Sequence, residues 1–354
     1  MPVGCQWTSP DVHLEREKRS LLGRRGEHPM IVERWHAVLD AQPVAIAETA
    51  TALVLGLDDG RVLHLDWRNG RALARVALHE AGLLALAVSP DGRHVLSGGA
   101  DGHLVVSTTA GALLSVACRD WVDRVAWVDR ARAVGTAGTH LARLDVDGQS
   151  EQRDLRRGVM ALATSSSRAP GIVAVAVSGS LLLVDAADLG RVEEHRVRAT
   201  GRSLAAHPAG AGWALGTQEQ TLLCLRMSDR RLSRLEGYVR PPRDVAFSPD
   251  GTSLATSGMD LLVVWSLPRL DCDEAEATLV ETDAEPVSLV RFQPLGRGLA
   301  VVTKAGTLFA LDAVAGTRVR VALGAPPTGL VFSSDGRSLA CTTTRSVHVY
   351  AWSS

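Results

Sequence analysis

Residues Val88–Thr108, VSPDGRHVLSGGADGHLVVST, place two tight turns between three short apolar runs. Asp-Gly between apolar runs is typical of a β-hairpin, because glycine adopts the positive φ that such a turn needs. The same form returns in VAFSPDGTSLATSGMDLLVVWS (Val245–Ser266) and in LVFSSDGRSLACTTTRSVHVYAWS (Leu330–Ser353). Three copies in one chain indicate internal repetition.

The repeat has a period of roughly 40 residues and can be followed along most of the chain. The first strand of each unit is predicted to begin near Val44, Leu84, Val122, Val159, Ser203, Arg243, Val287 and Thr328. Each unit contains three or four short β-rich runs, and none sustains a helical apolar period. This period, with four strands per unit, is typical of β-propeller blades, so we predict an all-β fold.

At this point the chain resembles the WD-repeat family, as a divergent and bacterial member. LALAVSPDGRHVLSGGADGHLVVST and DVAFSPDGTSLATSGMDLLVVWS match the family's strand, Ser-Pro-Asp-Gly turn, strand, Asp-containing turn and strand. The family often closes its third strand with Trp-Asp, whereas this chain keeps only the Asp in Leu65-Asp66, Leu144-Asp145, Val184-Asp185 and Leu311-Asp312. The family's His–Ser–Asp–Trp hydrogen-bond chain is expected to be complete in no unit: His79 could reach Asp101, but Ser107 stands at the Trp position.

The two ends of the repeat suggest how the ring closes. The last unit stops three strands in, at VHVYAWSS, while the segment before the first unit is strand-like from Ile31 to Leu39. Pairing of these N- and C-terminal strands would remove an exposed sheet edge. We therefore expect eight four-stranded blades, with seven as the alternative, in a single domain over residues 30–354. Residues 1–29 are expected to be a flexible or short-helical tail.

Composition sets limits on the environment. The formal net charge is −1, and the five cysteines form no Cys-x-x-Cys pair. The odd cysteine count argues against a disulfide framework, so a cytoplasmic, reducing environment is expected. No secretory signal is visible, and no apolar run is long enough to span a membrane.

No catalytic or metal-binding motif emerges, so we predict a chain that is not an enzyme and has no cofactor, metal or small-molecule substrate. The eleven histidines are scattered over different units. An alternative is a hydrolase-like or lactonase-like propeller enzyme, which would need carboxylates and histidines on the innermost strands. Those strands are predicted to be LALAV, VAFS and LVFS, which are apolar.

A second alternative is an accessory factor that binds nucleic acid through its arginine clusters. The chain has only four Phe and two Tyr, which is few for base stacking, so nucleic acid is not expected as a partner. The acidic stretch 271–285 is predicted to be a solvated loop, or alternatively a docking loop for a basic partner.

The family resemblance implies a protein–protein interaction scaffold, an accessory subunit of a multi-protein bacterial assembly. The partner surface is expected on one face, near the entries to the first strands of the third, fifth and sixth units. Trp, Tyr and Arg are enriched at interface hot spots. The candidate residues are Trp121, Asp123, Arg124, Arg202, Tyr238, Arg240 and Arg243; the matching positions in the second, seventh and eighth units are Leu84, Ser288 and Thr328.

Overall fold

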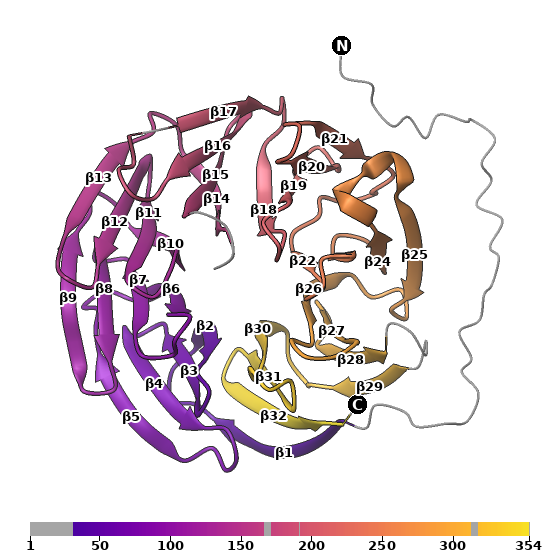
Figure 1. The fold of residues 1–354 in the computed structure, drawn as a ribbon. Helices are drawn as coiled ribbons and strands as arrows, with labels where there is room; N and C mark the ends of the chain where they lie inside the picture. Colours follow the sequence, from indigo (N-terminus) through magenta and orange to yellow (C-terminus); the bar gives the residue numbers. More distant parts are fainter. Residues whose placement is uncertain (1–30, 166–170, 191, 313–317, 354) are drawn as a thin grey trace.

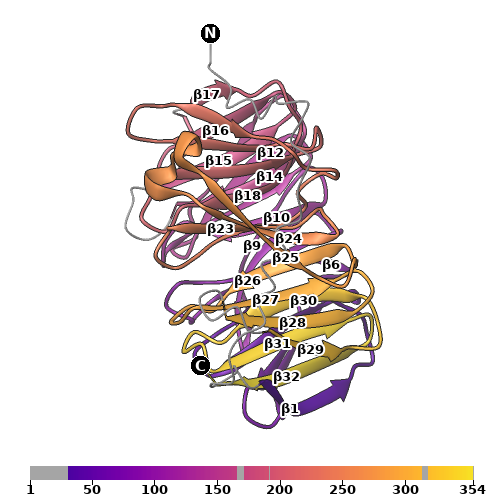
Figure 2. The ribbon, with the colours of Figure 1, turned by 90° about the vertical axis from the view of Figure 1, so that its right-hand side faces the viewer.

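The computed structural model describes residues 31–165, 171–190, 192–312 and 318–353, and shows eight four-stranded antiparallel sheets. The sheets stand side by side around a common axis (Figure 1), and Figure 2 shows the same ring from its side. The fold is thus an eight-bladed β-propeller, which confirms the predicted fold class and the larger of the two blade counts. The expected tail, residues 1–29, lies outside the described residues and stays a prediction.

Four blades make up the first half of the ring. Their strands, from the innermost to the outermost, are β2 (Pro43–Glu48), β3 (Ala52–Leu57), β4 (Arg61–Asp66) and β5 (Ala72–Ala77) in blade 1; β6 (Leu83–Val88), β7 (Val95–Gly99), β8 (His103–Thr108) and β9 (Gly111–Ala117) in blade 2; β10 (Val122–Trp127), β11 (Arg132–Ala137), β12 (His140–Asp145) and β13 (Ser150–Asp154) in blade 3; and β14 (Val159–Thr164), β15 (Ile172–Val177), β16 (Ser180–Asp185) and β17 (Val192–Arg196) in blade 4.

The second half repeats the plan. It comprises β18 (Gly201–Ala206), β19 (Gly212–Thr217), β20 (Leu222–Arg226) and β21 (Leu232–Leu235) in blade 5; β22 (Val245–Phe247), β23 (Ser253–Thr256), β24 (Leu261–Ser266) and β25 (Glu276–Glu281) in blade 6; β26 (Val287–Phe292), β27 (Gly298–Thr303), β28 (Thr307–Asp312) and β29 (Arg318–Ala322) in blade 7; and β30 (Pro327–Phe332), β31 (Ser338–Thr343), β32 (Ser346–Trp352) and β1 (Ile31–Val38) in blade 8.

Blade 8 closes the ring with strands from both ends of the described chain. Strand β1 pairs antiparallel with β32, with Ile31 opposite Trp352 and Val38 opposite Ser346. The two strands lie together at the bottom of Figure 1. The predicted closure is therefore confirmed, and strand β32 has no open edge.

The Ser-Pro-Asp-Gly turns form for a local reason. In blade 2 the Ser89 hydroxyl donates to Asp91 Oδ1 at 2.6 Å and accepts from the His94 backbone N–H at 3.0 Å. Gly92 follows with a φ of 71°, a conformation that favours glycine. The Ser248–Asp250 and Ser333–Asp335 turns repeat the same hydroxyl–carboxylate contact. Because each turn depends on residues close in sequence, it could be predicted from the sequence.

The core lies between neighbouring blades rather than inside any one of them. Second strands such as β3 and β27 are buried along their whole length, which explains their nearly continuous apolar sequences. One cluster joins Val134 and Leu141 of blade 3 to Val173 and Val175 of blade 4. Each blade thus covers an apolar face of the next, and the ring depends on every interface.

Candidate functional site

All the predicted interaction residues lie in segments at one face of the disc, although Tyr238 is buried beneath it. The links from the outermost strand of one blade to the innermost strand of the next hydrogen-bond with the hairpins between second and third strands. Val159 N–H donates to Gly138 O at 3.1 Å, and Lys304 N–H donates to Pro286 O at 2.9 Å. We call this edge the entry face. The other hairpins meet at the opposite face, where Val146 N–H donates to Ala131 O at 2.8 Å.

A β-bulge marks the start of most innermost strands. In seven blades the register with the second strand shifts after the first residue, which leaves one residue unpaired. Blade 6 pairs without such a shift. The unpaired residues are Val44, Leu84, Asp123, Met160, Arg202, Ser288 and Thr328, of which only Asp123 and Arg202 are exposed. Blades 3 and 5 therefore present charged groups where the other bulges present half-buried neutral ones.

Trp121 is the most conspicuous residue of the entry to blade 3, with 63% of its surface exposed. Its backbone N–H donates to Asp120 Oδ1 at 2.7 Å, which fixes the turn that carries it. Two residues on, the Arg124 guanidinium pairs with the carboxylate of Asp123. An exposed indole ring and an ion pair thus occur within four residues of the entry to blade 3.

The entry to blade 6 carries the second group of candidates. Arg240 Nη2 lies 3.6 Å from Asp260 Oδ1, and the neighbouring Val239 is 63% exposed. The Arg243 backbone N–H donates to Ser257 Oγ at 3.2 Å, whereas its side chain is exposed and contacts no carboxylate among the described residues. The entry loop is thus pinned through its backbone, which leaves the Arg243 guanidinium free for an outside group.

Tyr238 does not belong to this surface, which corrects one of the sequence expectations. The residue is only 5% exposed, and its hydroxyl lies 2.9 Å from Thr256 Oγ1. Trp265 Nε1–H donates to the same hydroxyl at 2.6 Å. Burial also raises the pKa of Tyr238 above its usual value. Its role is to brace blade 6 beneath the exposed entry loop.

Blade 2 contains the remnant of the family's hydrogen-bond chain. His79 Nδ1 lies 3.0 Å from Asp101 Oδ1, and His79 Nε2 lies 2.8 Å from Ser97 Oγ. Ser107 stands apart and donates to Val95 O at 3.3 Å. The prediction that His79 reaches Asp101 without a Trp partner is confirmed. Burial lowers the pKa of His79 despite the neighbouring carboxylate.

The acidic stretch 271–285 is not the solvated loop that its sequence suggested. It contributes a 3-10 turn, η2 (Cys272–Glu274), and the whole of strand β25, after a first 3-10 turn, η1 (Pro268–Leu270). Asp271 accepts from Arg226 of blade 5 at 2.8 Å, and Asp283 accepts from Arg318 of blade 7 at 3.1 Å. The basic groups that meet this stretch therefore include arginines of the two neighbouring blades.

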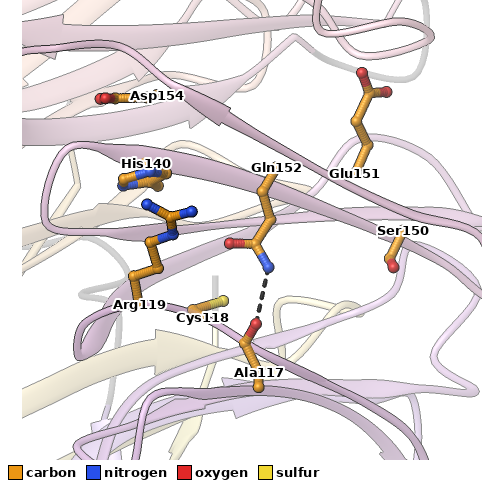
Figure 3. Close-up of a pocket in the computed structure, with 8 residues that line it drawn as sticks. All are labelled: Ala117, Cys118, Arg119, His140, Ser150, Glu151, Gln152 and Asp154. Carbon is orange, nitrogen blue, oxygen red and sulfur yellow. Dashed lines mark hydrogen bonds between the residues drawn. The ribbon is translucent and has the colours of Figure 1, made fainter.

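An open groove of about 590 Å³ lies between the outer strands of blades 2 and 3. Figure 3 shows Arg119 and His140 close together in it, with the Gln152 amide donating to Ala117 O at 2.8 Å. The lining is mostly polar and comprises Ala117, Cys118, Arg119, His140, Ser150, Glu151, Gln152 and Asp154. Arg119, which lines the groove, lies two residues before Trp121 in the chain.

Two segments match the family model for the WD domain, G-beta repeat: residues 70–106 and 230–264. Each runs from the end of one blade through the first three strands of the next, which is β5–β8 in the first and β21–β24 in the second. The chain is a WD-repeat β-propeller. No curated protein matches the sequence.

The innermost strands of this WD-repeat propeller contain few charged side chains. Across the eight strands the charged residues are Glu48, Asp123, Arg124, Arg202 and Arg291, and there is no histidine. Arg291 donates to Asp244 at 2.6 Å. The described residues include no group of three or more His, Cys, Asp or Glu side chains arranged to hold a metal ion. Nor does the described part contain a helix long and apolar enough to cross a membrane.

Proposed function

We propose that this propeller is a non-catalytic scaffold that binds another protein through the entry face of blades 3, 5 and 6. The observation that carries the proposal is Trp121, which is 63% exposed beside the Asp123–Arg124 pair and the free Arg119. A large exposed indole flanked by arginines is typical of an interface anchor, because it buries much area and still offers a donor.

The candidate contact residues differ in how well their positions suit a role in binding. Trp121, Asp123, Arg124, Arg202, Arg240 and Arg243 lie on the entry face and remain proposed contact residues, whereas Tyr238 supports the face from beneath. Val239 joins the set as a second exposed apolar side chain. The partner, the larger assembly and a cytoplasmic location remain proposals, the last resting on the cysteine pattern of the sequence.

The propeller-enzyme alternative has less support. A hydrolytic site in the middle of the ring would need converging carboxylates and histidines, and the innermost strands have Glu48 and Asp123 as their only carboxylates. The Asp123 carboxylate is already paired with Arg124. These strands therefore offer no general acid–base pair, which favours the scaffold.

The test combines four substitutions on the entry face: Trp121, Arg124, Arg240 and Arg243, each to alanine. A matched control changes one apolar residue and three arginines of the opposite face, Leu295, Arg68, Arg130 and Arg297, all of which are exposed. We expect the entry-face variant to lose the partner recovered by wild type in a quantitative pull-down, with a near-normal melting temperature. Retention of that partner, or its equal loss in the control, would reject the proposal.

A further inference from the structure

Four exposed arginines at the entries to three blades have no side-chain partner among the described residues. They are Arg119, Arg198, Arg202 and Arg243, and they occur at the entries to blades 3, 5 and 6. None of their guanidinium groups makes a hydrogen bond or ion pair with any other described residue. Arg156, at the entry to blade 4, extends the series and lies near Asp154, to whose Oδ1 its backbone N–H donates at 2.8 Å.

The carboxylates of this sector are already engaged. Asp123 pairs with Arg124, and both oxygens of Glu219 accept from the Thr200 backbone N–H, at 3.1 and 2.9 Å. Asp244 accepts from the Val290 backbone N–H at 2.8 Å and from Arg291 at 2.6 Å. The side chains of this sector that lack a partner among the described residues are therefore arginines, whose guanidinium groups donate hydrogen bonds. The entries to blades 1 and 2 instead expose carboxylates at Asp40, Asp58 and Glu80. Of these, Asp40 pairs with Arg61 at 3.0 Å and Asp58 accepts from the Gln42 backbone N–H at 2.9 Å.

Arg198 has an unusual backbone conformation in addition to a side chain without a partner among the described residues. Its φ is 49°, in the left-handed region, while two other entry loops place glycines there, Gly237 at 100° and Gly324 at 78°. A non-glycine residue in this region costs free energy that is usually offset by a local contact. Arg230, also left-handed at 58°, has such a contact, since its Nε lies 3.1 Å from Glu193. Arg198 has none among the described residues.

We call these four residues, Arg119, Arg198, Arg202 and Arg243, the arginine arc. We propose that this arc binds an acidic polypeptide segment of the partner protein. The inference rests on the scaffold function proposed above and names the chemistry of the bound element. A guanidinium presents a planar set of donors that matches a carboxylate, so several arginines would select a run of Asp or Glu. Trp121 would pack against an apolar side chain of the same segment.

Nucleic acid also offers anions, but the entry face fits it less well. Binding to single strands combines cations with several aromatic rings on which bases stack. Trp121 is the single large aromatic side chain among the exposed hydrophobic residues of the described chain. One ring among arginines is better matched to a polypeptide with mixed acidic and apolar residues.

The test measures binding of a fluorescein-labelled peptide of alternating Glu and Leu to the full-length protein by fluorescence anisotropy at low salt. A peptide with Gln in place of Glu, and a single-stranded oligothymidine of equal charge, serve as the other probes. We expect the Glu peptide to bind most tightly and the Gln peptide at least about tenfold more weakly, because each lost charged hydrogen bond weakens binding severalfold. Tighter binding of oligothymidine would overturn the assignment to an acidic polypeptide.

Two sets of substitutions assign the binding to the arc. One changes Arg119, Arg202 and Arg243 to alanine and Arg198 to glycine; the control changes Arg68, Arg71, Arg130 and Arg297 of the opposite face to alanine. Both remove four positive charges. We expect at least about a tenfold loss of Glu-peptide affinity in the first set and little change in the control. Equal losses would mean non-specific attraction and would overturn the proposal.

Arg198→Gly alone separates binding from folding. Glycine suits the left-handed backbone, so this variant should melt at or above the wild-type temperature while binding the Glu peptide more weakly. Unchanged affinity would exclude Arg198 from the site. If the Glu peptide fails to bind wild type while the four alanines at Trp121, Arg124, Arg240 and Arg243 still abolish partner recovery, the acidic segment is rejected and the scaffold function stands.

Discussion

Tyr238 joins two strands of blade 6 through one hydroxyl group, between Thr256 of β23 and Trp265 of β24. We expect Tyr238→Phe to destabilise the fold by about 1–3 kcal/mol, because the buried indole N–H loses its acceptor. Chemical denaturation measures this cost. Tyr350→Phe is the control, since Tyr350 is also buried but its hydroxyl bonds to no described residue. Equal effects of the two substitutions would show that the hydrogen bonds contribute nothing.

The Tyr238 interaction also shows a limit of the sequence. The aspartates that close third strands, such as Asp66 and Asp185, are recognisable in the sequence from the family pattern. In the structure each accepts a hydrogen bond from the backbone N–H two residues on. Tyr238 is separated from Trp265 by a whole hairpin and stands in an entry loop with exposed neighbours. Its sequence position therefore suggested a surface anchor, and only the packing of blade 6 reveals that its ring is buried.

At the scale of elements, the strand starts and the closing pair of β1 with β32 were predictable, whereas the ion pairs between blades were not. The predicted starts of the innermost strands lie within two residues of those observed, for example Ser203 against Gly201 and Arg243 against Val245. The acidic stretch was misjudged because its ion pairs join residues far apart, such as Arg226 and Asp271. Local turn chemistry is visible in a sequence, whereas contacts between blades are not.

Strand β1 provides the prediction at this scale. Deleting residues 1–40 removes β1 and exposes the edge of β32, which should cost several kcal/mol and cause aggregation. Deleting only residues 1–29 keeps β1 and serves as the control. Size-exclusion chromatography and thermal melting measure both. A soluble, monomeric deletion of 1–40 with an unchanged melting temperature would contradict ring closure through β1.

At the scale of the whole molecule, three buried histidines make stability depend on pH. Burial lowers the pKa of His64, His79 and His207 below the ordinary histidine value of about 6.5. The unfolded chain therefore binds more protons below about pH 6.5, so this contribution is fully present above that pH and is lost as the pH falls. We expect the melting temperature to drop by a few degrees between about pH 7.5 and 5.5.

His207→Gln isolates one of these groups. Its Nε2 lies 3.1 Å from Gly251 O, a contact that the glutamine amide can replace without titrating. The variant should lose less stability on acidification than wild type, while His36→Gln, at a residue exposed on the surface, should behave as wild type. A flat melting temperature over this pH range in wild type would contradict the prediction.

The entry face as a docking surface is the central claim for the whole molecule, and photo-crosslinking tests it most directly. The photoreactive residue p-benzoylphenylalanine is placed at Trp121 on the entry face or at Leu295 on the opposite face, sites that are 63% and 77% exposed. After irradiation of cells that express each variant at equal level, mass spectrometry identifies the adducts. The account predicts a specific protein adduct at position 121 and none at 295. The same adduct at 295 in the absence of one at 121 would contradict it.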